Sequence, residues 1–298
     1  MSTYNGEKYL RDQVDSVLNQ DGVDVDLLIR DDGSNDGTLG ILDDLKHANQ
    51  NISVITGPNC KSAASFMALI YEAGKLDHIY DYYAFCDQDD VWCQDKLISA
   101  VGQLDECPQS PSALYLGAYQ MVDADLRKID TPVRPPLLNL KSAIASNAAT
   151  GCTMVFNRNL LLLLASKKPQ DFIMHDYWAY LVCLVSGGHV VYDAVPHILY
   201  RQHGHNVIGG LGDGFIKRWI VRIRKVFCAS DSFKSKLAGQ LLSCYADMMS
   251  SEDRKFLERV ATCRKLSSKL YLLATPGVLG RTFDKKLQMI GLIITGKL

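Results

Sequence analysis

Three carboxylates follow directly on an apolar run in Tyr83-Ala84-Phe85-Cys86-Asp87-Gln88-Asp89-Asp90-Val91-Trp92. The apolar run is typical of the end of a buried strand, and a protein interior holds such carboxylates only where a cation or hydrogen bonds compensate them. Side chains alternate along a strand, so Asp87 and Asp89 are expected on one face, where they can share Mg²⁺ or Mn²⁺, with Asp90 pointing elsewhere. The alternative is a solvated acidic turn that caps a helix expected over Asp95 to Leu104.

Helical and strand patterns alternate through the residues around this run. Amphipathic helices are expected at Glu7 to Leu18, Thr38 to His47 and Ala63 to Gly74, and strands at Val25 to Ile29, Ile52 to Thr56 and Tyr82 to Cys86. Such alternation predicts an α/β fold with a mainly parallel central sheet, in which ligands bind beyond the carboxyl ends of the strands. Asp31/Asp32 and Asp87/Asp89 both fall at such ends, so a functional site is expected there.

Strand and helix patterns continue beyond this part of the chain, and only helical patterns are found near its C-terminal end. Further strands are expected at Leu114 to Leu116, Ala118 to Val122, Thr150 to Phe156 and His189 to Tyr192, and helices at Asn159 to Ala165 and Trp178 to Val185. After Gly209 only helices are expected, at Lys234 to Met249, Asp253 to Leu273 and Lys285 to Ile294. The sequence therefore predicts an α/β domain over residues 1–210 and a basic helical region over residues 211–298.

Charge is distributed unevenly between these two parts. The formal net charge is −1, but residues 1–212 carry 15 Lys/Arg and 26 Asp/Glu, whereas residues 213–298 carry 17 and 7. Phe215 to Phe227 mixes five cations with bulky apolar side chains. This composition favours either contact with phosphates or an anionic membrane interface, or ordinary helices with solvated basic faces. A nucleic-acid partner is not expected.

Cysteine usage and hydropathy bear on the compartment. Nine cysteines are scattered without a Cys-x-x-Cys pair, which is typical of free thiols in a reducing compartment. No signal peptide is found, and no apolar run approaches the roughly 18 residues that a spanning helix needs. We therefore expect a cytoplasmic protein, with any membrane contact peripheral and at the inner face.

Three further side chains are candidates for chemistry. Asp176 stands where a helix begins, so it either stabilises the helix dipole or, beside His175 and two aromatic residues, acts as a general base. Arg201 and His203 follow a strand, where they are suited to bind an anion such as a diphosphate, or to complete a metal site in the case of His203.

The first acidic cluster also has a second interpretation. Residues suited to a calcium loop stand at Asp32, Ser34, Asp36, Gly37 and Asp43. A strand rather than a helix precedes the segment, the twelfth position is Asp rather than Glu, and no paired loop is found. Calcium storage is therefore disfavoured.

Five motifs in order resemble family 2 glycosyltransferases, and most of all their bacterial rhamnosyltransferase-like branch. They are Ser2-Thr3-Tyr4-Asn5-Gly6-Glu7, Asp31-Asp32-Gly33-Ser34-Asn35-Asp36-Gly37-Thr38, Asp87-Gln88-Asp89-Asp90-Val91-Trp92, His175-Asp176-Tyr177-Trp178 and Tyr200-Arg201-Gln202-His203. The likeness covers roughly residues 1–206, and the ordered set is far more specific than Asp-x-Asp alone. It departs from the family at the start, where Met1 occupies the last position of an apolar first strand, and at His175, where many relatives have Glu.

The resemblance implies a GT-A fold and an inverting, single-displacement transfer of a sugar from a nucleotide donor, with dTDP-rhamnose expected and UDP-sugars as the alternative. The implied acceptor is a saccharide or a lipid-linked saccharide of the cell surface. Roles follow for the matching residues. Ser2 and Tyr4 would line the nucleotide pocket, Asp32 would bind the base, Asp87 the ribose or metal, Asp89 the metal, Arg201 and His203 the diphosphate or metal, and Asp176 would be the catalytic base.

Two other classes of function stay open at this point. A metal-dependent nucleotidyltransferase also uses paired carboxylates on an α/β rim, but the Gly-rich basic phosphate loop that favours it is not found near the first strand. A non-catalytic nucleotide-sugar binding or scaffold protein is the other alternative, because the apolar first strand of the family is missing or truncated at the start.

Overall fold

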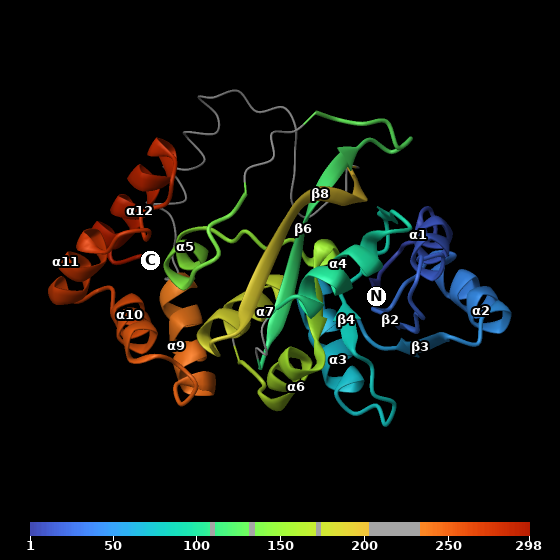
Figure 1. Cartoon of the computed structure of the whole chain (residues 1–298), viewed down its shortest axis with the longest axis horizontal. Helices are drawn as coiled ribbons and strands as arrows, with labels where there is room; N and C mark the ends of the chain where they lie inside the picture. The colour runs from blue at the N-terminus through green and yellow to red at the C-terminus, as the bar shows by residue number, and fades with distance from the viewer. Residues whose placement is uncertain (108–110, 131–134, 171–173, 203–232) are drawn as a thin grey trace.

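The computed structural model describes residues 1–107, 111–130, 135–170, 174–202 and 233–298. Within them, two sheets lie between helices, and a group of helices forms one end of the molecule (Figure 1). The predicted boundary at residue 210, the basic segment Phe215 to Phe227 and His203 all fall outside the described residues. The two-domain division therefore stays a prediction.

The first sheet is parallel throughout, with strand order β1-β2-β3. Its strands are β1 (Ser2–Thr3), β2 (Leu27–Asp31) and β3 (Ile52–Thr56), and the accompanying helices are α1 (Leu10–Leu18), α2 (Thr38–Ala48) and α3 (Ser62–Ala73). In the resemblance Met1 is the last residue of the first strand, but in the structure Ser2 and Thr3 pair with β2. The amides of Arg30 and Asp32 donate to the carbonyls of Met1 and Thr3, at 2.9 and 2.8 Å. This pairing sets the opening loop beside the carboxyl end of β2.

The second sheet is mixed, with strand order β4-β7-β6-β8-β5. It contains β4 (Tyr82–Ala84), β5 (Val91–Trp92), β6 (Ala113–Val122), β7 (Val155–Asn157) and β8 (His189–Arg201). Only β6 and β8 run parallel, and the other three pairs are antiparallel. The prediction of a mainly parallel sheet thus describes the first sheet better than the second.

Two long strands form the middle of the second sheet and run side by side (Figure 1). The segments predicted at Leu114 to Leu116 and Ala118 to Val122 are one strand, β6, with shifts in register after Gly117. Strand β8 continues past the predicted end at Tyr192 to Arg201. Because of that extension, Arg201 lies beside the end of β6, close to the loop after β4.

Helices cover the second sheet and frame the loops at its end. They are α4 (Lys96–Asp105), α5 (Leu140–Ala145), α6 (Arg158–Ser166) and α7 (His175–Val185), with the short 3-10 helix η1 at Gly151–Thr153. Helix α7 is the central one, because all but one of its eleven residues are buried. The predicted strand from Thr150 is instead η1 followed by β7, so a turn rather than an extended strand faces the start of α7.

The C-terminal helices pack onto this framework. They are α9 (Phe233–Tyr245), α10 (Ser251–Ala261), α11 (Leu266–Ala274) and α12 (Phe283–Thr295). Leu241 and Tyr245 of α9 belong to the same hydrophobic cluster as Trp178 of α7. The single helix predicted over Asp253 to Leu273 is two helices, α10 and α11. In the part of the chain that the structure describes, no helix has the length and apolar character required to cross a membrane.

Candidate active site

A cavity of about 460 Å³ opens where β1, β2 and β4 end and α7 begins. It brings together six of the eight side chains that the sequence predicts for the site, namely Ser2, Tyr4, Asp32, Asp87, Asp89 and Asp176. Arg201 is not among the residues that line it, and His203 lies outside the described residues. Motifs separated by more than 170 residues in sequence therefore meet around one cavity.

The loop that carries the acidic residues is positioned by hydrogen bonds rather than by a strand. Strand β4 ends at Ala84, so the alternation expected to place Asp87 and Asp89 on one face does not extend to them. Gln88 links the loop to the chain after β1. Its Oε1 accepts from the Thr3 hydroxyl at 2.7 Å and the Tyr4 amide at 2.8 Å, and its Nε2 donates to the Tyr4 carbonyl at 3.2 Å. Both carboxylates nevertheless line the cavity.

Negative charge accumulates in this loop. Burial, together with the nearby carboxylates of Asp89 and Asp176, raises the pKa of Asp87 to about 7. Burial is also the main cause that raises the pKa of Asp90 well above its usual value. Carboxylates whose pKa values rise in this way repel one another, and a bound cation removes that repulsion.

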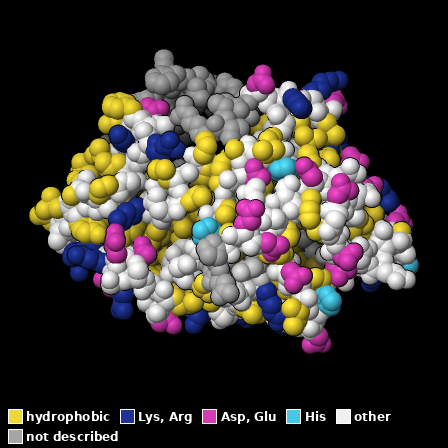
Figure 2. All heavy atoms as spheres, viewed as in Figure 1, with side chains coloured by type: hydrophobic (Ala, Val, Ile, Leu, Met, Phe, Trp, Pro, Cys, Tyr) yellow, Lys and Arg dark blue, Asp and Glu magenta, His cyan; other side chains and the backbone are white. Residues whose placement is uncertain are grey.

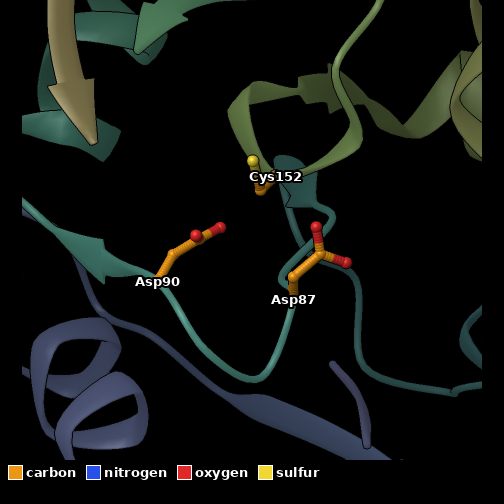
Figure 3. Close-up of side chains that lie close together, drawn as sticks. All are labelled: Asp87, Asp90 and Cys152. Carbon is orange, nitrogen blue, oxygen red and sulfur yellow. The ribbon is translucent and has the colours of Figure 1, made fainter. Parts of the chain in front are cut away.

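The sequence predicts that Asp90 points away from Asp87, but in the structure the two carboxylates lie close together. One oxygen of each carboxylate and the sulfur of Cys152 lie within 4.8 Å of one another (Figure 3). The loop curves after β4, and the Arg201 amide donates to Asp90 Oδ1 at 3.1 Å, which turns Asp90 inward. Burial raises the pKa of the Cys152 thiol well above 9, so it stays protonated and is a poor ligand for a hard cation. The oxygen ligands suited to Mg²⁺ or Mn²⁺ are carboxylates, and those of Asp87 and Asp89 line the cavity.

Arg201 lies beneath the acidic loop. Its guanidinium is almost fully buried, donates from Nε to the Asp89 carbonyl at 2.9 Å and from Nη1 to the Ala124 carbonyl at 2.8 Å, and lies over the Tyr9 ring. The sequence assigns Arg201 to the diphosphate, but in the structure it bonds the loop backbone. Its position follows from the extension of β8, which the local sequence pattern does not reveal.

Lys96 is a second buried cation, which sequence reasoning missed. The residue is 1% exposed, and its ammonium lies 3.6 Å from the centroid of the Trp92 ring and has no hydrogen-bond partner among the described residues. Burial lowers its pKa to about 8, opposed by the nearby Cys86, Cys152 and Asp90. Lys96 therefore places positive charge near Asp90, although it is not among the residues that line the cavity.

Asp32 lines the cavity and is held by a cluster of donors. Arg30 Nη1 donates to Oδ1 at 2.5 Å, and the amides of Cys60 and Lys61 donate at 2.9 Å. Burial favours protonation of Asp32, but the bonds from Arg30 and Cys60 outweigh it, so the pKa is lowered and the carboxylate stays ionised. Asp32 is thus paired with Arg30 rather than directed toward Asp36, whose carboxylate caps Thr38. This arrangement does not suit the calcium loop.

Asp176 occupies the first turn of α7. Its Oδ2 accepts from the Gly151 amide at 3.1 Å and its Oδ1 accepts from the Tyr177 amide at 2.6 Å. The residue is 6% exposed, and burial raises its pKa above the usual 3.8. A fixed carboxylate of raised proton affinity at a cavity wall has the properties of a general base.

The fold and the sequence together define a family. The sequence profile of glycosyl transferase family 2 matches residues 1–161, which is more than half of the chain. The chain therefore belongs to glycosyl transferase family 2, and it is a glycosyltransferase.

The chain resembles other glycosyltransferases in sequence and shares its fold with solved structures. The chain is 29% identical to the dTDP-rhamnosyl transferase RfbG of Shigella flexneri, over 70% of this chain and 73% of that protein. It is 30% identical to the putative teichuronic acid biosynthesis glycosyltransferase TuaG of Bacillus subtilis, over 51% and 58%. Residues 1–349 of S. aureus TarS in complex with UDP share its fold, with a TM-score of 0.54, 14% identity, and coverage of 99% of this chain and 89% of that chain. The fold is GT-A, as the resemblance implied.

Proposed function

We propose that this enzyme transfers rhamnose from dTDP-rhamnose to a saccharide of the cell surface, with inversion at the anomeric carbon. One observation carries the proposal. Carboxylates suited to a diphosphate-bound cation and a separate buried carboxylate, Asp176, line the same cavity. Likeness to a dTDP-rhamnosyl transferase supports rhamnose over other sugars.

The nucleotide part of the donor is assigned to the side of the cavity formed by Ser2, Tyr4 and Asp32. Tyr4 is 44% exposed and free to lie against a base, whereas Asp32 is fixed by Arg30 and presents an ionised acceptor. An ionised carboxylate of this kind accepts strongly from a base N–H group. Ser2 borders the same space, with its hydroxyl donating to Ser65 at 2.7 Å.

A divalent cation, Mg²⁺ or Mn²⁺, is assigned to Asp87 and Asp89. When bound, it supplies positive charge to the diphosphate that departs. The raised pKa of Asp87 fits this assignment, because a carboxylate crowded by two others is the kind of group that a cation stabilises. A mannosyltransferase from Pyrobaculum calidifontis in complex with GDP-Man and Mn²⁺ shares the fold, with a TM-score of 0.50 and 16% identity over 99% of this chain and 78% of that chain.

Asp176 is assigned as the base. An acceptor hydroxyl attacks the anomeric carbon from the side opposite to the diphosphate, and its proton passes to the Asp176 carboxylate. The carbon–oxygen bond to the diphosphate breaks as the new glycosidic bond forms, so the configuration inverts. The bonds from Gly151 and Tyr177 hold the carboxylate in place during this step.

Calorimetric titration tests the donor assignment. The chain is titrated with dTDP, UDP and GDP, each with Mn²⁺ and with a chelator. The proposal predicts micromolar, metal-dependent binding of dTDP and weaker binding of the others. Tighter binding of UDP than of dTDP would indicate that the donor is a UDP-sugar instead of dTDP-rhamnose. Binding of no nucleotide would contradict the assignment of a nucleotide-sugar donor.

A lipid-linked acceptor would bring the enzyme to the inner face of the membrane, and the C-terminal helices offer a surface for that contact. We define the apolar face of α11 and α12 by five side chains that are 40 to 72% exposed: Leu266, Leu270, Phe283, Leu287 and Ile294. Figure 2 shows hydrophobic side chains gathered at this end of the molecule, with Lys and Arg nearby. Helix α12 already buries Met289 and Ile293, so the apolar face is a second stripe, on its outer side.

Charge supports an anionic lipid surface as the partner of this face. Residues 264–298 contain seven Lys/Arg and a single acidic residue, Asp284. An exposed apolar stripe bordered by cations suits the interface of an anionic bilayer. We therefore assign a lipid surface, rather than a second copy of the chain, as the partner of this face. Association of two copies would instead appear as a change in oligomeric state.

Vesicle flotation tests the membrane contact. Wild-type protein should bind vesicles with 30% anionic lipid at least tenfold more tightly than neutral ones. Leu270→Glu combined with Phe283→Glu should abolish this binding. Ile79→Glu is the matched control, since Ile79 is 64% exposed but lies between α3 and β4. Equal binding to both kinds of vesicle, or unchanged binding by the double variant, would contradict the contact.

A further inference from the structure

His175 is a buried imidazole whose hydrogen-bonding groups are unused. It is the first residue of α7, is 3% exposed, and lines the cavity next to Asp176. Neither Nδ1 nor Nε2 has a hydrogen-bond partner among the described residues. Buried polar atoms are nearly always satisfied, so two orphaned nitrogens at a cavity wall indicate that a ligand supplies the partner.

Two aromatic rings fix the imidazole. The ring of Phe66 stacks on it with centroids 3.8 Å apart and planes at 18°, and the ring of Phe85 meets it edge-on at 4.7 Å. Phe66 and Phe85 are themselves buried, and they contact each other. The direction of the two nitrogens is therefore set before any ligand arrives, and such preorganisation favours a specificity-determining contact.

The imidazole is neutral. Burial lowers the pKa of His175 to about 3, so at physiological pH one nitrogen carries a proton and the other accepts. One donor and one acceptor match hydroxyl groups, each of which can both donate and accept. A diphosphate offers acceptors alone, so it would leave the accepting nitrogen without a partner.

The position next to Asp176 identifies which part of the donor His175 meets. In the proposed reaction the base stands beside the sugar, on the side opposite to the diphosphate. Nε2 of His175 is also directed toward Gly151, where an added Cβ would lie 2.8 Å from it. Gly151 donates its amide to Asp176, so imidazole, glycine and carboxylate border one region of the cavity.

We propose that His175 binds a hydroxyl of the transferred sugar and thereby selects the donor, an inference that rests on the proposed function. The side chain acts by hydrogen bonding through a ring nitrogen, while its ring is held by Phe66 and Phe85. It is not the base. The sugar, rather than the nucleotide, is the part of the donor that this residue recognises.

Calorimetry with two ligands separates sugar recognition from nucleotide recognition. Wild-type protein and His175→Phe are each titrated with dTDP-rhamnose and with dTDP in the presence of Mn²⁺. Phenylalanine keeps the ring shape and its stacking but lacks both nitrogens. The affinity for dTDP-rhamnose should fall about tenfold, whereas the affinity for dTDP should stay within twofold, because only the sugar loses its partner.

A second variant distinguishes hydrogen bonding from shape. His175→Gln carries an amide nitrogen near the position of Nε2 and should recover most of the affinity for dTDP-rhamnose. His47→Gln, on an exposed helix, should change neither affinity and serves as the control. If the ratio of the affinities for dTDP-rhamnose and dTDP is the same in His175→Phe as in wild type, the inference about His175 is wrong, whereas the proposed function is unaffected. Failure of wild-type protein to bind dTDP-rhamnose would instead contradict the proposed donor.

Discussion

The backbone amide of Gly151 donates to Oδ2 of Asp176 at 3.1 Å, which joins the turn before β7 to the first turn of α7. The same glycine faces His175, and its Cα approaches so closely that a Cβ there would lie 2.8 Å from Nε2 and 3.4 Å from the Asp176 Cβ. Gly151 thus permits a close approach of backbone to both side chains. The position of the proposed base depends on a residue without a side chain.

Gly151→Ala should therefore reduce catalysis. The added methyl group displaces His175 or Asp176, and small displacements at a reacting centre reduce kcat/KM by about a hundredfold. Donor turnover and the free energy of unfolding are the measurements. Gly40→Ala is the control, because a Cβ at Gly40 in α2 meets nothing within 4 Å and alanine favours the helix. Full activity of Gly151→Ala would contradict the close approach.

The Arg30–Asp32 pair should matter for stability. Arg30→Met leaves a buried carboxylate without its main partner and should lower the free energy of unfolding by about 3 kcal/mol, as measured by urea denaturation. Arg11→Met, which breaks the exposed pair with Asp44, should cost less than about 1 kcal/mol. Equal effects of the two variants would show that the buried pair contributes no more than the exposed one.

The contribution of Asp32 should also depend on pH. Its folded-state pKa is lowered below 3.8, so the stability that its interactions provide is present above pH 3.8 and is lost as the pH falls through the folded pKa. The stability difference between wild type and Arg30→Met should accordingly be constant from pH 5 upward and shrink in stronger acid. A difference that grows on acidification would contradict this sign.

Metal binding should be coupled to a proton. Asp87, with a pKa of about 7, must lose its proton before it binds a cation, so the affinity for Mn²⁺ should rise by about tenfold from pH 6 to pH 8. Titration of metal-free protein with Mn²⁺ at these pH values measures it. In Asp89→Asn the affinity should be weaker and the pKa of Asp87 lower, because a repelling charge is gone. An affinity that does not vary with pH would exclude Asp87 from the site.

Activity should fall in acid through Asp176. Its pKa is raised above 3.8 by burial, and a general base works only when ionised. At saturating Mn²⁺, where metal binding no longer varies with pH, the pH profile of kcat/KM should therefore have an acid limb with an apparent pKa above 3.8. An acid limb at or below 3.8 would indicate that a less buried carboxylate controls the reaction.

The periodicity of the sequence was sufficient for the helices and strands from Leu10 to Ala84, because each has a local pattern of apolar and polar residues, but it did not predict the pairing of Ser2 and Thr3 with β2. It was also sufficient for the meeting of Asp32, Asp87 and Asp176, through the ordered motifs. It was insufficient for Arg201 and Asp90, whose positions depend on the path of β8. That path is fixed by pairing with β6, about 80 residues earlier in the chain, and no local pattern encodes it.

The buried cations near the site could not be predicted from the sequence either. Arg30 and Lys96 stand in ordinary strand and helix patterns, where a cation usually faces solvent. Their burial arises from tertiary contacts with Asp32 and Trp92. The lack of hydrogen-bond partners for the two His175 nitrogens is likewise visible only in the structure, where Phe66 and Phe85 contact the imidazole ring.

Donor hydrolysis by wild type and by Asp176→Asn is the most direct test of the central claim. Water replaces the unknown acceptor, so release of dTDP from dTDP-rhamnose reports on the base. The account predicts at least a hundredfold slower release by the variant, with unchanged calorimetric affinity for dTDP-rhamnose, because asparagine keeps the carboxylate's shape without its basicity. Equal rates of dTDP release by the two proteins would contradict the assignment of Asp176 as the base.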